Sequence, residues 1–238
     1  MKDRFIKKDL QILLPVYNEG KFILKLLNNI TKTLKNLVNF QIIISEDGST
    51  DLTQEILKKN LKKFKYILLS QKKRVGYSQA VTNGIKKASS EYLLIMDADG
   101  QCDYNDITRL WKKRNKADII AGYRANRKDY MYRKIFSKLC YLVYKILFNV
   151  PLRDPSFGFS LMNKKVYQSM NLKKNMCPVG FFWEFNAIAS MKKFTFLEVG
   201  INHKKRASGK TKIYHIYDLP KIAIQHLIGL LLVKFSKH

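Results

Sequence analysis

The stretch YLLIMDADGQ, residues 92–101, decides the fold of this 238-residue chain. It begins with an apolar run and passes at once into two carboxylates, Asp97 and Asp99, with Gln101 just beyond them. A short apolar run bounded by polar residues is typical of a buried strand. The stretch therefore predicts a strand, Tyr92 to Asp97, that ends in an acidic loop.

Four other short runs rich in β-branched and aliphatic residues are also expected to be buried strands. Helical patterns lie between them, and the clearest places apolar residues from Phe22 to Leu37 on one stripe of 3.6-residue period. This alternation predicts an α/β fold, a Rossmann-like and mostly parallel sheet flanked by helices, whose ligand crevice lies beyond the carboxyl ends of the strands. The four runs are Leu10 to Val16, Gln41 to Glu46, Tyr66 to Ser70 and Asp118 to Ala121.

The acidic loop is the first candidate site. Asp97 and Asp99 at a strand end can converge on one hard divalent cation, and the amide oxygen of Gln101 can complete the protein's share of the ligands. Mg²⁺ or Mn²⁺ in such a site neutralises charge on a departing nucleoside diphosphate. Acidic residues also cap helices and fill turns, so the triplet alone is weak evidence.

Two more polar loops follow the first and second expected strands. One is Pro15-Val16-Tyr17-Asn18-Glu19, and the other runs from Glu46 to Asp51. In the second loop Gly48 permits a tight turn and Ser49 or Thr50 can cap the next helix, which would be a purely structural role. Carboxylates at three neighbouring strand ends nevertheless predict one shared crevice.

After about residue 122 the pattern changes, and we expect the regular sheet to end there. A basic stretch, 122–134, precedes an apolar helical pattern from Ile135 to Val150 and a turn-rich segment from Pro151 to Phe159. A helix, a last strand, a basic loop and a terminal helix complete the expected order. They span Phe181 to Lys192, Phe196 to His203, residues 204–212 and the region around Ile222 to Val233.

The terminal amphipathic helix raises the question of a membrane. Its apolar part, Ile222 to Val233, is too short to span a bilayer, which takes about 20 residues. Lysines flank it, so it can lie in the interface as an amphipathic helix or pack on the protein's own core. The sequence leaves both alternatives open, for this helix and for the segment from Ile135 to Val150.

The net charge narrows the classes of possible partner. Lys and Arg number 45 against 18 Asp and Glu, which gives a formal charge of +27 and favours anionic partners. The sequence contains no nucleic-acid-binding motif, so we expect no nucleic-acid partner.

The cysteines and the amino terminus bear on cellular location. Cys102, Cys140 and Cys177 have no disulfide or zinc spacing, and residues 1–20 do not resemble a signal peptide, so a cytoplasmic location is expected.

Seven segments in order resemble the inverting family 2 glycosyltransferases of GT-A fold, particularly the branch with dolichol-phosphate mannose synthase and polyprenyl-phosphate glucosyltransferases. Three positions depart from the family pattern: Glu46 replaces the usual Asp, Arg74 stands where Asn often precedes the glycine, and the usual Asn is displaced by one place at Thr82-Asn83. These departures leave the base and the sugar open. The seven segments are LPVYNE (14–19), EDGSTD (46–51), the Gly76, Ala80, Gly84 helix, DADGQ (97–101), DPSFGFSLM (154–162), FFWE (181–184) and RASGKTK (206–212).

The resemblance implies a role for each matching position. Asp97, Asp99 and Gln101 would hold the metal, with Asp97, Asp99 and Arg206 as the catalytic residues. The donor would be a UDP- or GDP-sugar and the acceptor a polyprenyl or dolichyl phosphate at a membrane. Donor-binding residues would be Pro15, Tyr17, Glu19, Asp47, Asp97, Arg206 and Lys212, and acceptor-binding residues Arg124, Arg133 and Ser137.

The acceptor class decides whether a base is needed. A lipid phosphate is already anionic, whereas a saccharide hydroxyl needs a general base, for which Asp154 and Glu184 are the candidates. Both carboxylates have a structural alternative as ion-pair or hydrogen-bond partners. Nucleotidyl transfer is less favoured because LPVYNE stands where a Gly-rich loop would be, and an inert interaction protein is disfavoured by the intact acidic triplet.

The expected organisation is a catalytic domain over 1–212 and a terminal helical extension over 213–238. The catalytic domain would comprise a nucleotide-sugar-binding half, 1–122, and an acceptor-binding half, 123–212. The branch often carries transmembrane helices after this domain, and we expect none in these 238 residues. The protein would then sit peripherally on the cytoplasmic face of a membrane, and a separate membrane protein is a further expected partner.

Overall fold

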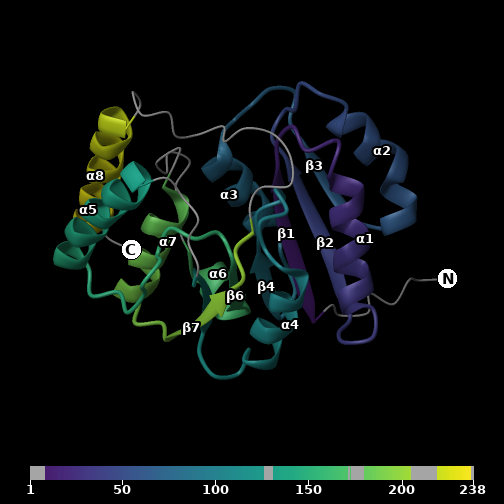
Figure 1. The fold of residues 1–238 in the computed structure, drawn as a ribbon. Coiled ribbons are helices and arrows are strands. Elements are labelled where there is room, and N and C mark those ends of the chain that lie inside the picture. The colour runs from purple at the N-terminus through teal and green to yellow at the C-terminus, as the bar shows by residue number, and fades with distance from the viewer. Residues whose placement is uncertain (1–8, 126–130, 171, 173–179, 205–218, 237–238) are drawn as a thin grey trace.

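A computed structural model describes residues 9–125, 131–170, 172, 180–204 and 219–236 of the chain. One seven-stranded sheet forms its centre, in the order β3-β2-β1-β4-β6-β5-β7 (Figure 1). The core residues alternate between its two faces: along β1, Ile12 and Leu14 join the cluster on one side, and Leu13 joins the cluster on the other. This alternation is what a strand covered on both faces requires.

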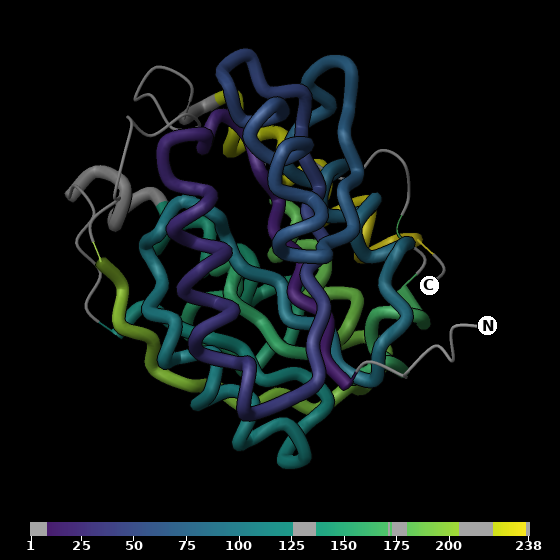
Figure 2. Tube along the Cα trace, turned by 90° about the vertical axis from the view of Figure 1, so that its right-hand side faces the viewer, coloured from purple at the N-terminus to yellow at the C-terminus, as the bar shows by residue number. Residues whose placement is uncertain are grey.

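The first four strands run parallel and carry the predicted βαβ rhythm. They are β1 (Leu10–Val16), β2 (Phe40–Glu46), β3 (Ile67–Ser70) and β4 (Tyr92–Ile95), so the strand predictions are confirmed, although β4 ends two residues before Asp97. The helices between them are α1 (Ile23–Leu34), α2 (Thr53–Phe64) and α3 (Tyr77–Lys87). In Figure 2 the purple α1 and the blue α2 lie on the near side of the sheet, and the yellow α8 (Leu219–Phe235) lies on the far side.

The expectation that the regular sheet ends near residue 122 is wrong. Strand β5 (Ile119–Arg124) continues past that point, and β6 (Ser160–Asn163) enters antiparallel between β4 and β5. The predicted last strand is confirmed as β7 (Phe196–Ile201), although it ends two residues before His203, and it pairs parallel with β5 at the edge of the sheet. The expected boundary between the two halves therefore falls inside β5, and both halves share one sheet.

Of the remaining helices, α4 packs with α1 on one face of the sheet, and the others build the layer on the α3 side. Helix α7 is buried along nearly its whole length, because it packs between the sheet and α8. Helix α8 contacts both α7 and α5. The bounds are α4 (Tyr104–Lys112), α5 (Met131–Leu147), α6 (Lys164–Ser169) and α7 (Phe181–Met191).

The terminal helix packs on the protein's core through one face, as one of the two alternatives expects, and exposes its other face. Ile222, Leu230 and Val233 are buried, whereas Leu232 is 63% exposed and Phe235 is 83% exposed. No helix in the described ranges is long and apolar enough to cross a membrane.

Candidate active site

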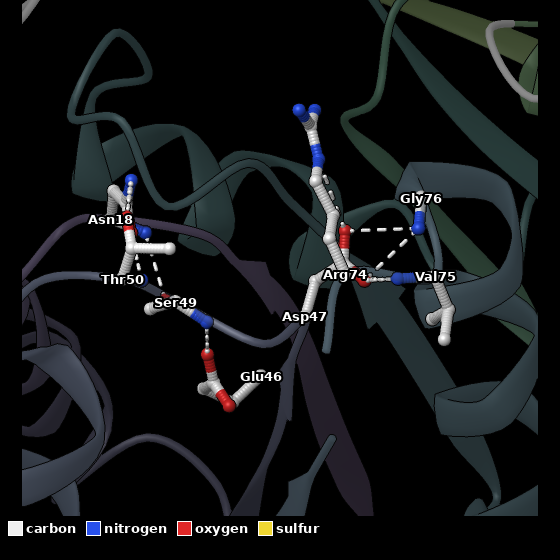
Figure 3. A network of polar contacts seen from close by, with 8 residues as sticks. All are labelled: Asn18, Glu46, Asp47, Ser49, Thr50, Arg74, Val75 and Gly76. Carbon is white, nitrogen blue, oxygen red and sulfur yellow. Dashed lines mark hydrogen bonds and ion pairs between the residues drawn. The ribbon is translucent and has the colours of Figure 1, made fainter. Parts of the chain in front are cut away.

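The loops after β1 and β2 are tied together through Asn18, which has a left-handed backbone with φ of 53° (Figure 3). Its backbone amide donates to Ser49 Oγ at 2.9 Å, and the amide of Thr50 donates to Asn18 Oδ1 at 2.8 Å. Asn adopts this conformation more readily than most residues. The two carboxylate-bearing loops are thus held side by side at the carboxyl ends of their strands.

The predicted cap at Ser49 or Thr50 is wrong, because both residues bond to Asn18 instead. The carboxylate of Asp51 accepts from the amide of Thr53, the first residue of α2, at 3.0 Å. Asp51 thus does for α2 what an N-cap side chain does.

Glu46, one of the departures from the family pattern, is a structural anchor. It is fully buried and accepts hydrogen bonds from Ser49 N at 2.5 Å, Gln54 Nε2 at 2.8 Å and Ser70 Oγ at 3.0 Å. These three donors come from the following loop, from α2 and from β3. The longer Glu side chain thus joins the loop, α2 and β3.

Asp47 faces the start of α3 (Figure 3). Its Oδ1 accepts from the amides of Val75 at 2.7 Å and Gly76 at 3.0 Å, and Arg74 Nε lies 3.8 Å from its Oδ2. Burial raises the pKa of Asp47, while the two amides and the Arg74 guanidinium oppose that rise. Arg74 also lies over the ring of Tyr17, with 4.3 Å between its Cζ and the ring centroid, so Tyr17, Asp47 and Arg74 form one cluster.

Asp97 is held by a residue that sequence reasoning missed. Tyr77 Oη donates to Asp97 Oδ1 at 2.7 Å. Burial raises the pKa of Tyr77 well above its ordinary value, and the charge of Asp97 adds to this, so the phenol is a donor at neutral pH. A β-carbon at Gly158 would lie 2.9 Å from Tyr77 Oη and 3.1 Å from each carboxylate oxygen of Asp97; only a glycine lets the turn before β6 approach this closely.

The loop after Asp97 is joined to the end of β7. Gly100, with φ of 75°, turns the chain, and Gln101 N then donates to Asp99 Oδ1 at 3.1 Å. The Gln101 side chain donates through Nε2 to Lys204 O at 3.2 Å, and Cys102 forms an isolated β-bridge with His203. The chain therefore leaves the described region at Lys204 directly beside the acidic loop.

The donor atoms in this loop suit a hard cation. Within the described ranges no three His, Cys, Asp or Glu side chains gather as for a metal ion. The candidate metal ligands are the carboxylates of Asp97 and Asp99 and the Oε1 of Gln101. The amide nitrogen of Gln101 is turned the other way, toward the carbonyl of Lys204. All are oxygen ligands of the kind that Mg²⁺ and Mn²⁺ take, with the remaining positions left to phosphate and water.

Arg124 and Asp154, predicted as an acceptor ligand and a possible base, form an ion pair. Arg124 Nε lies 2.6 Å from Asp154 Oδ2 and Arg124 Nη2 lies 2.8 Å from Oδ1, a bidentate arrangement that Ser156 Oγ extends at 3.0 Å. Both side chains are largely buried, at 14% and 13% exposed. The pair fastens β5 to the turn that carries Gly158.

The other predicted site residues lie as follows. Pro15 is within β1, and Glu19 is buried, with its carbonyl accepting from the amide of Ile23 at the start of α1. Glu184 is buried in the first turn of α7, and Ser137 is half-buried on α5. Arg206 and Lys212 lie outside the described residues, as does the side chain of Arg133.

A mostly parallel sheet with acidic loops at the carboxyl ends of β1, β2 and β4 defines a GT-A fold. The chain belongs to glycosyl transferase family 2, whose model matches residues 11–170.

Curated relatives agree with this family, and a solved structure agrees with the fold. The dolichol-phosphate mannosyltransferase of Pyrococcus furiosus is 29% identical over 227 residues, which cover 88% of this chain and 63% of that protein. Dolichyl-phosphate beta-glucosyltransferase ALG5A of Trichomonas vaginalis is 26% identical, covering 96% of this chain and 77% of the relative. Glucosyl-3-phosphoglycerate synthase from Mycobacterium tuberculosis has been solved with Mn²⁺, UDP and glucosyl-3-phosphoglycerate. It superposes on this chain with a TM-score of 0.71 at 15% identity, and the match covers 95% of this chain and 80% of the synthase chain. This similarity shows that the two proteins share a fold.

Proposed function

We propose that this protein transfers a hexose from a UDP- or GDP-sugar to a polyprenyl or dolichyl phosphate. The observation that carries the proposal is the linked pair of carboxylates: Asp47 and Asp97 are bonded to the adjacent residues Gly76 and Tyr77. A nucleoside bound at one and a diphosphate at the other would span the crevice as one ligand. The named activities of the mannosyltransferase and the glucosyltransferase supply the acceptor class.

The donor would lie across three strand ends. Tyr17 and Arg74 would contact the nucleoside, with Pro15 and Glu19 shaping the loop beneath them, and Asp47 would accept a hydrogen bond from the base or ribose. Arg206 and Lys212 would hold the donor phosphates from the segment that follows Lys204. A guanidinium matches phosphate oxygens in a bidentate geometry, which suits Arg206 to this position.

Asp97, Asp99 and Gln101 would hold a divalent metal, Mg²⁺ or Mn²⁺. A bound cation of this kind neutralises charge that builds on a departing nucleoside diphosphate. The structure of the synthase solved with Mn²⁺ and UDP supports such a metal in this fold.

The reaction would be a single displacement. An acceptor phosphate oxygen forms a bond to the anomeric carbon from one face while the bond to the donor diphosphate breaks on the other, which inverts the configuration. Because that oxygen is already anionic, positioning and charge neutralisation suffice without a general base. The pairing of Asp154 with Arg124 agrees with a reaction that does not use Asp154 as a base.

Arg124, Arg133 and Ser137 would form the acceptor-phosphate site at the start of α5. Two of the Arg124 guanidinium nitrogens are engaged by Asp154, so Arg133 would supply the main phosphate contact. Arg133→Ala should accordingly raise the acceptor KM more than the donor KM.

A lipid-phosphate acceptor would bring the protein to a membrane, and α5 and α8 would offer the contact surface. Both helices expose apolar side chains at helical spacing, and the two helices touch each other and lie together at one edge of the molecule (Figure 1). Neither Met131–Leu147 nor Leu219–Phe235 contains an acidic residue, so anionic lipid is the occupant that their charge favours. The exposed apolar side chains are Leu139, Leu142, Val143 and Ile146 on α5 and Ile224, Leu227, Ile228, Leu231, Leu232 and Phe235 on α8.

We therefore propose a peripheral location on the cytoplasmic face of an anionic membrane. A separate membrane protein seated on α5 and α8 is the competing occupant. Pure lipid vesicles distinguish the two, because binding to protein-free vesicles needs no such partner.

The activity is tested by incubating the purified protein and Mn²⁺ or Mg²⁺ with radiolabelled UDP- and GDP-sugars and a short polyprenyl phosphate. Metal-dependent label in the organic phase is expected from one donor, with none from Asp99→Ala. Asp9→Ala, at the opposite end of β1, is the matched control and should keep wild-type turnover. Donor hydrolysis without lipid labelling would overturn the phosphate acceptor and point to a saccharide hydroxyl.

A further inference from the structure

Tyr77 stands at a junction of three segments. As the first residue of α3 it is fixed by the helix, and its hydroxyl reaches the loop after β4, where it donates to Asp97 Oδ1 at 2.7 Å. The turn before β6 closes over this contact, since a β-carbon on Gly158 would approach both partners within 3.1 Å. The contact is therefore part-buried, with the Gly158 turn packed against one side of it.

The same short segment also holds the nucleoside-side carboxylate. Val75 N and Gly76 N donate to Asp47 at 2.7 and 3.0 Å, and Tyr77 follows immediately. Three consecutive residues thus donate to two carboxylates that come from different strand ends. The spacing between Asp47 and Asp97 is set by this segment.

We propose that Tyr77 is a positioning residue, whose hydroxyl holds the Asp97 carboxylate through Oδ1 and so orients that carboxylate for the divalent cation and the donor diphosphate. The inference rests on the proposed function, because it assumes the cation there. A carboxylate turns about its side-chain bonds, and a hydrogen bond to one oxygen removes that freedom before the ligand arrives. Partners that orient ligands in this way typically change metal affinity or activity about 10–100-fold when they are removed.

The test is Mn²⁺ binding without turnover, followed by the electron paramagnetic resonance of free Mn²⁺ in the presence of UDP or GDP. Tyr77→Phe removes only the hydroxyl and should weaken Mn²⁺ binding about 10-fold. Tyr167→Phe is the matched control, because that buried hydroxyl donates to Ser90 O away from the site. The control should leave Mn²⁺ affinity unchanged, even where both variants lower the melting temperature alike.

Gly158→Ala gives a second, independent measurement. Its β-carbon would press on Tyr77 Oη and on Asp97, so it should weaken Mn²⁺ binding in the wild-type background. In the Tyr77→Phe background the effect should be smaller, because residues that share one contact are not additive.

These measurements distinguish the role of Tyr77 from the existence of the metal site. Equal Mn²⁺ affinity in wild type and Tyr77→Phe would overturn the role of Tyr77 while leaving the metal site in place. A wild-type protein that binds no Mn²⁺ with either nucleotide would overturn both the role of Tyr77 and the proposed metal site. Strictly additive effects of Tyr77→Phe and Gly158→Ala would also contradict a shared contact.

Discussion

At the scale of single residues, the ion pair of Arg124 and Asp154 allows a structural role of Asp154 to be tested against a role as the catalytic base. Removing one partner of a buried ion pair leaves an uncompensated charge, which costs about 3–5 kcal/mol. Asp154→Ala should therefore lower the free energy of unfolding by roughly 3 kcal/mol in urea titrations.

A neighbouring pair provides the control for this prediction. Arg153 is 75% exposed and its Nε lies 3.5 Å from Glu198, so Arg153→Ala should change stability by less than about 1 kcal/mol. An Asp154→Ala protein with wild-type stability and no turnover would instead mark Asp154 as the base.

Gly48 and Gly76 both have positive φ, but only Gly48 has close neighbours where a β-carbon would lie. Replacing each by alanine therefore distinguishes backbone strain from steric collision. Gly76 has φ of 94° with nothing within 4 Å of a built β-carbon, so Gly76→Ala should cost about 1–3 kcal/mol of strain alone. At Gly48 a β-carbon would lie 2.3 Å from Lys73 C and 2.5 Å from Arg74 N. Gly48→Ala should cost roughly 2 kcal/mol more in urea unfolding, because overpacking is added.

The functional consequence differs between these glycines as well. The collision at Gly48 would displace Arg74 from Tyr17, so fluorescence titration with UDP and GDP should show weaker nucleotide binding. Equal losses of stability for Gly48→Ala and Gly76→Ala would contradict the collision.

The sequence alone predicted the acidic residues of the candidate site but not the residues that hold them. Carboxylates at strand ends are visible as a pattern, because strand ends can be located from hydrophobicity. Tyr77 and Arg74 have no such signal: their contacts depend on how α3 is placed against β2 and β4. Gly158 belongs to the segment DPSFGFSLM, but the need for a glycine there comes from the closeness of Tyr77, which only the folded structure shows.

At the scale of elements, the exposed face of α5 and α8 can be tested by removing its most exposed side chains. Ile146 is 77% exposed and Phe235 is 83% exposed, so Ile146→Ser with Phe235→Ser should leave the fold intact. If both side chains enter the lipid interface, the loss of roughly 1.5 kcal/mol each weakens binding to phosphatidylglycerol vesicles about 100-fold.

Exposed leucines elsewhere give a matched control for that pair. Leu52 and Leu61 lie next to and within α2, on the other side of the sheet, and are 63% and 40% exposed. Leu52→Ser with Leu61→Ser should bind vesicles as the wild type does in flotation assays. An equal loss in both double variants would show that apolar surface in general, and not this face, drives binding.

The elements were predictable to different degrees for a physical reason. Parallel strands covered on both faces show as continuous apolar runs, and these were located to within a few residues. Strand β6, Ser160–Asn163, has four residues and follows a turn-rich segment, so nothing local distinguishes it. Its strand character comes from pairing with β4 and β5, which are distant in the chain.

At the scale of the whole molecule, the charge of +27 predicts a strong effect of salt. Raising ionic strength from 0.1 to 1 M shortens the screening length from about 10 to 3 Å. Binding to phosphatidylglycerol vesicles should fall at least about 10-fold over that range, since each Lys near the surface contributes about 1 kcal/mol at low salt.

Neutral vesicles give the contrast for this experiment. Binding to phosphatidylcholine vesicles, measured by sedimentation, should be weak and nearly independent of salt. Tight, salt-resistant binding to neutral vesicles would contradict an electrostatic contribution to membrane binding. Retention on nucleic acid at physiological salt would instead indicate a nucleic-acid partner, which we do not expect.

The position of β6 has a consequence for how the chain is made. On the ribosome, β4 is complete at residue 95 and β5 at residue 124, yet the strand that joins them ends only at residue 163. Until then one edge of β4 and both edges of β5 are unpaired, since β7 follows later still, and unpaired edges invite pairing with other chains. A translational pause shortly after residue 124 should therefore be a point of aggregation, and a fragment ending there should require a chaperone that the full chain does not.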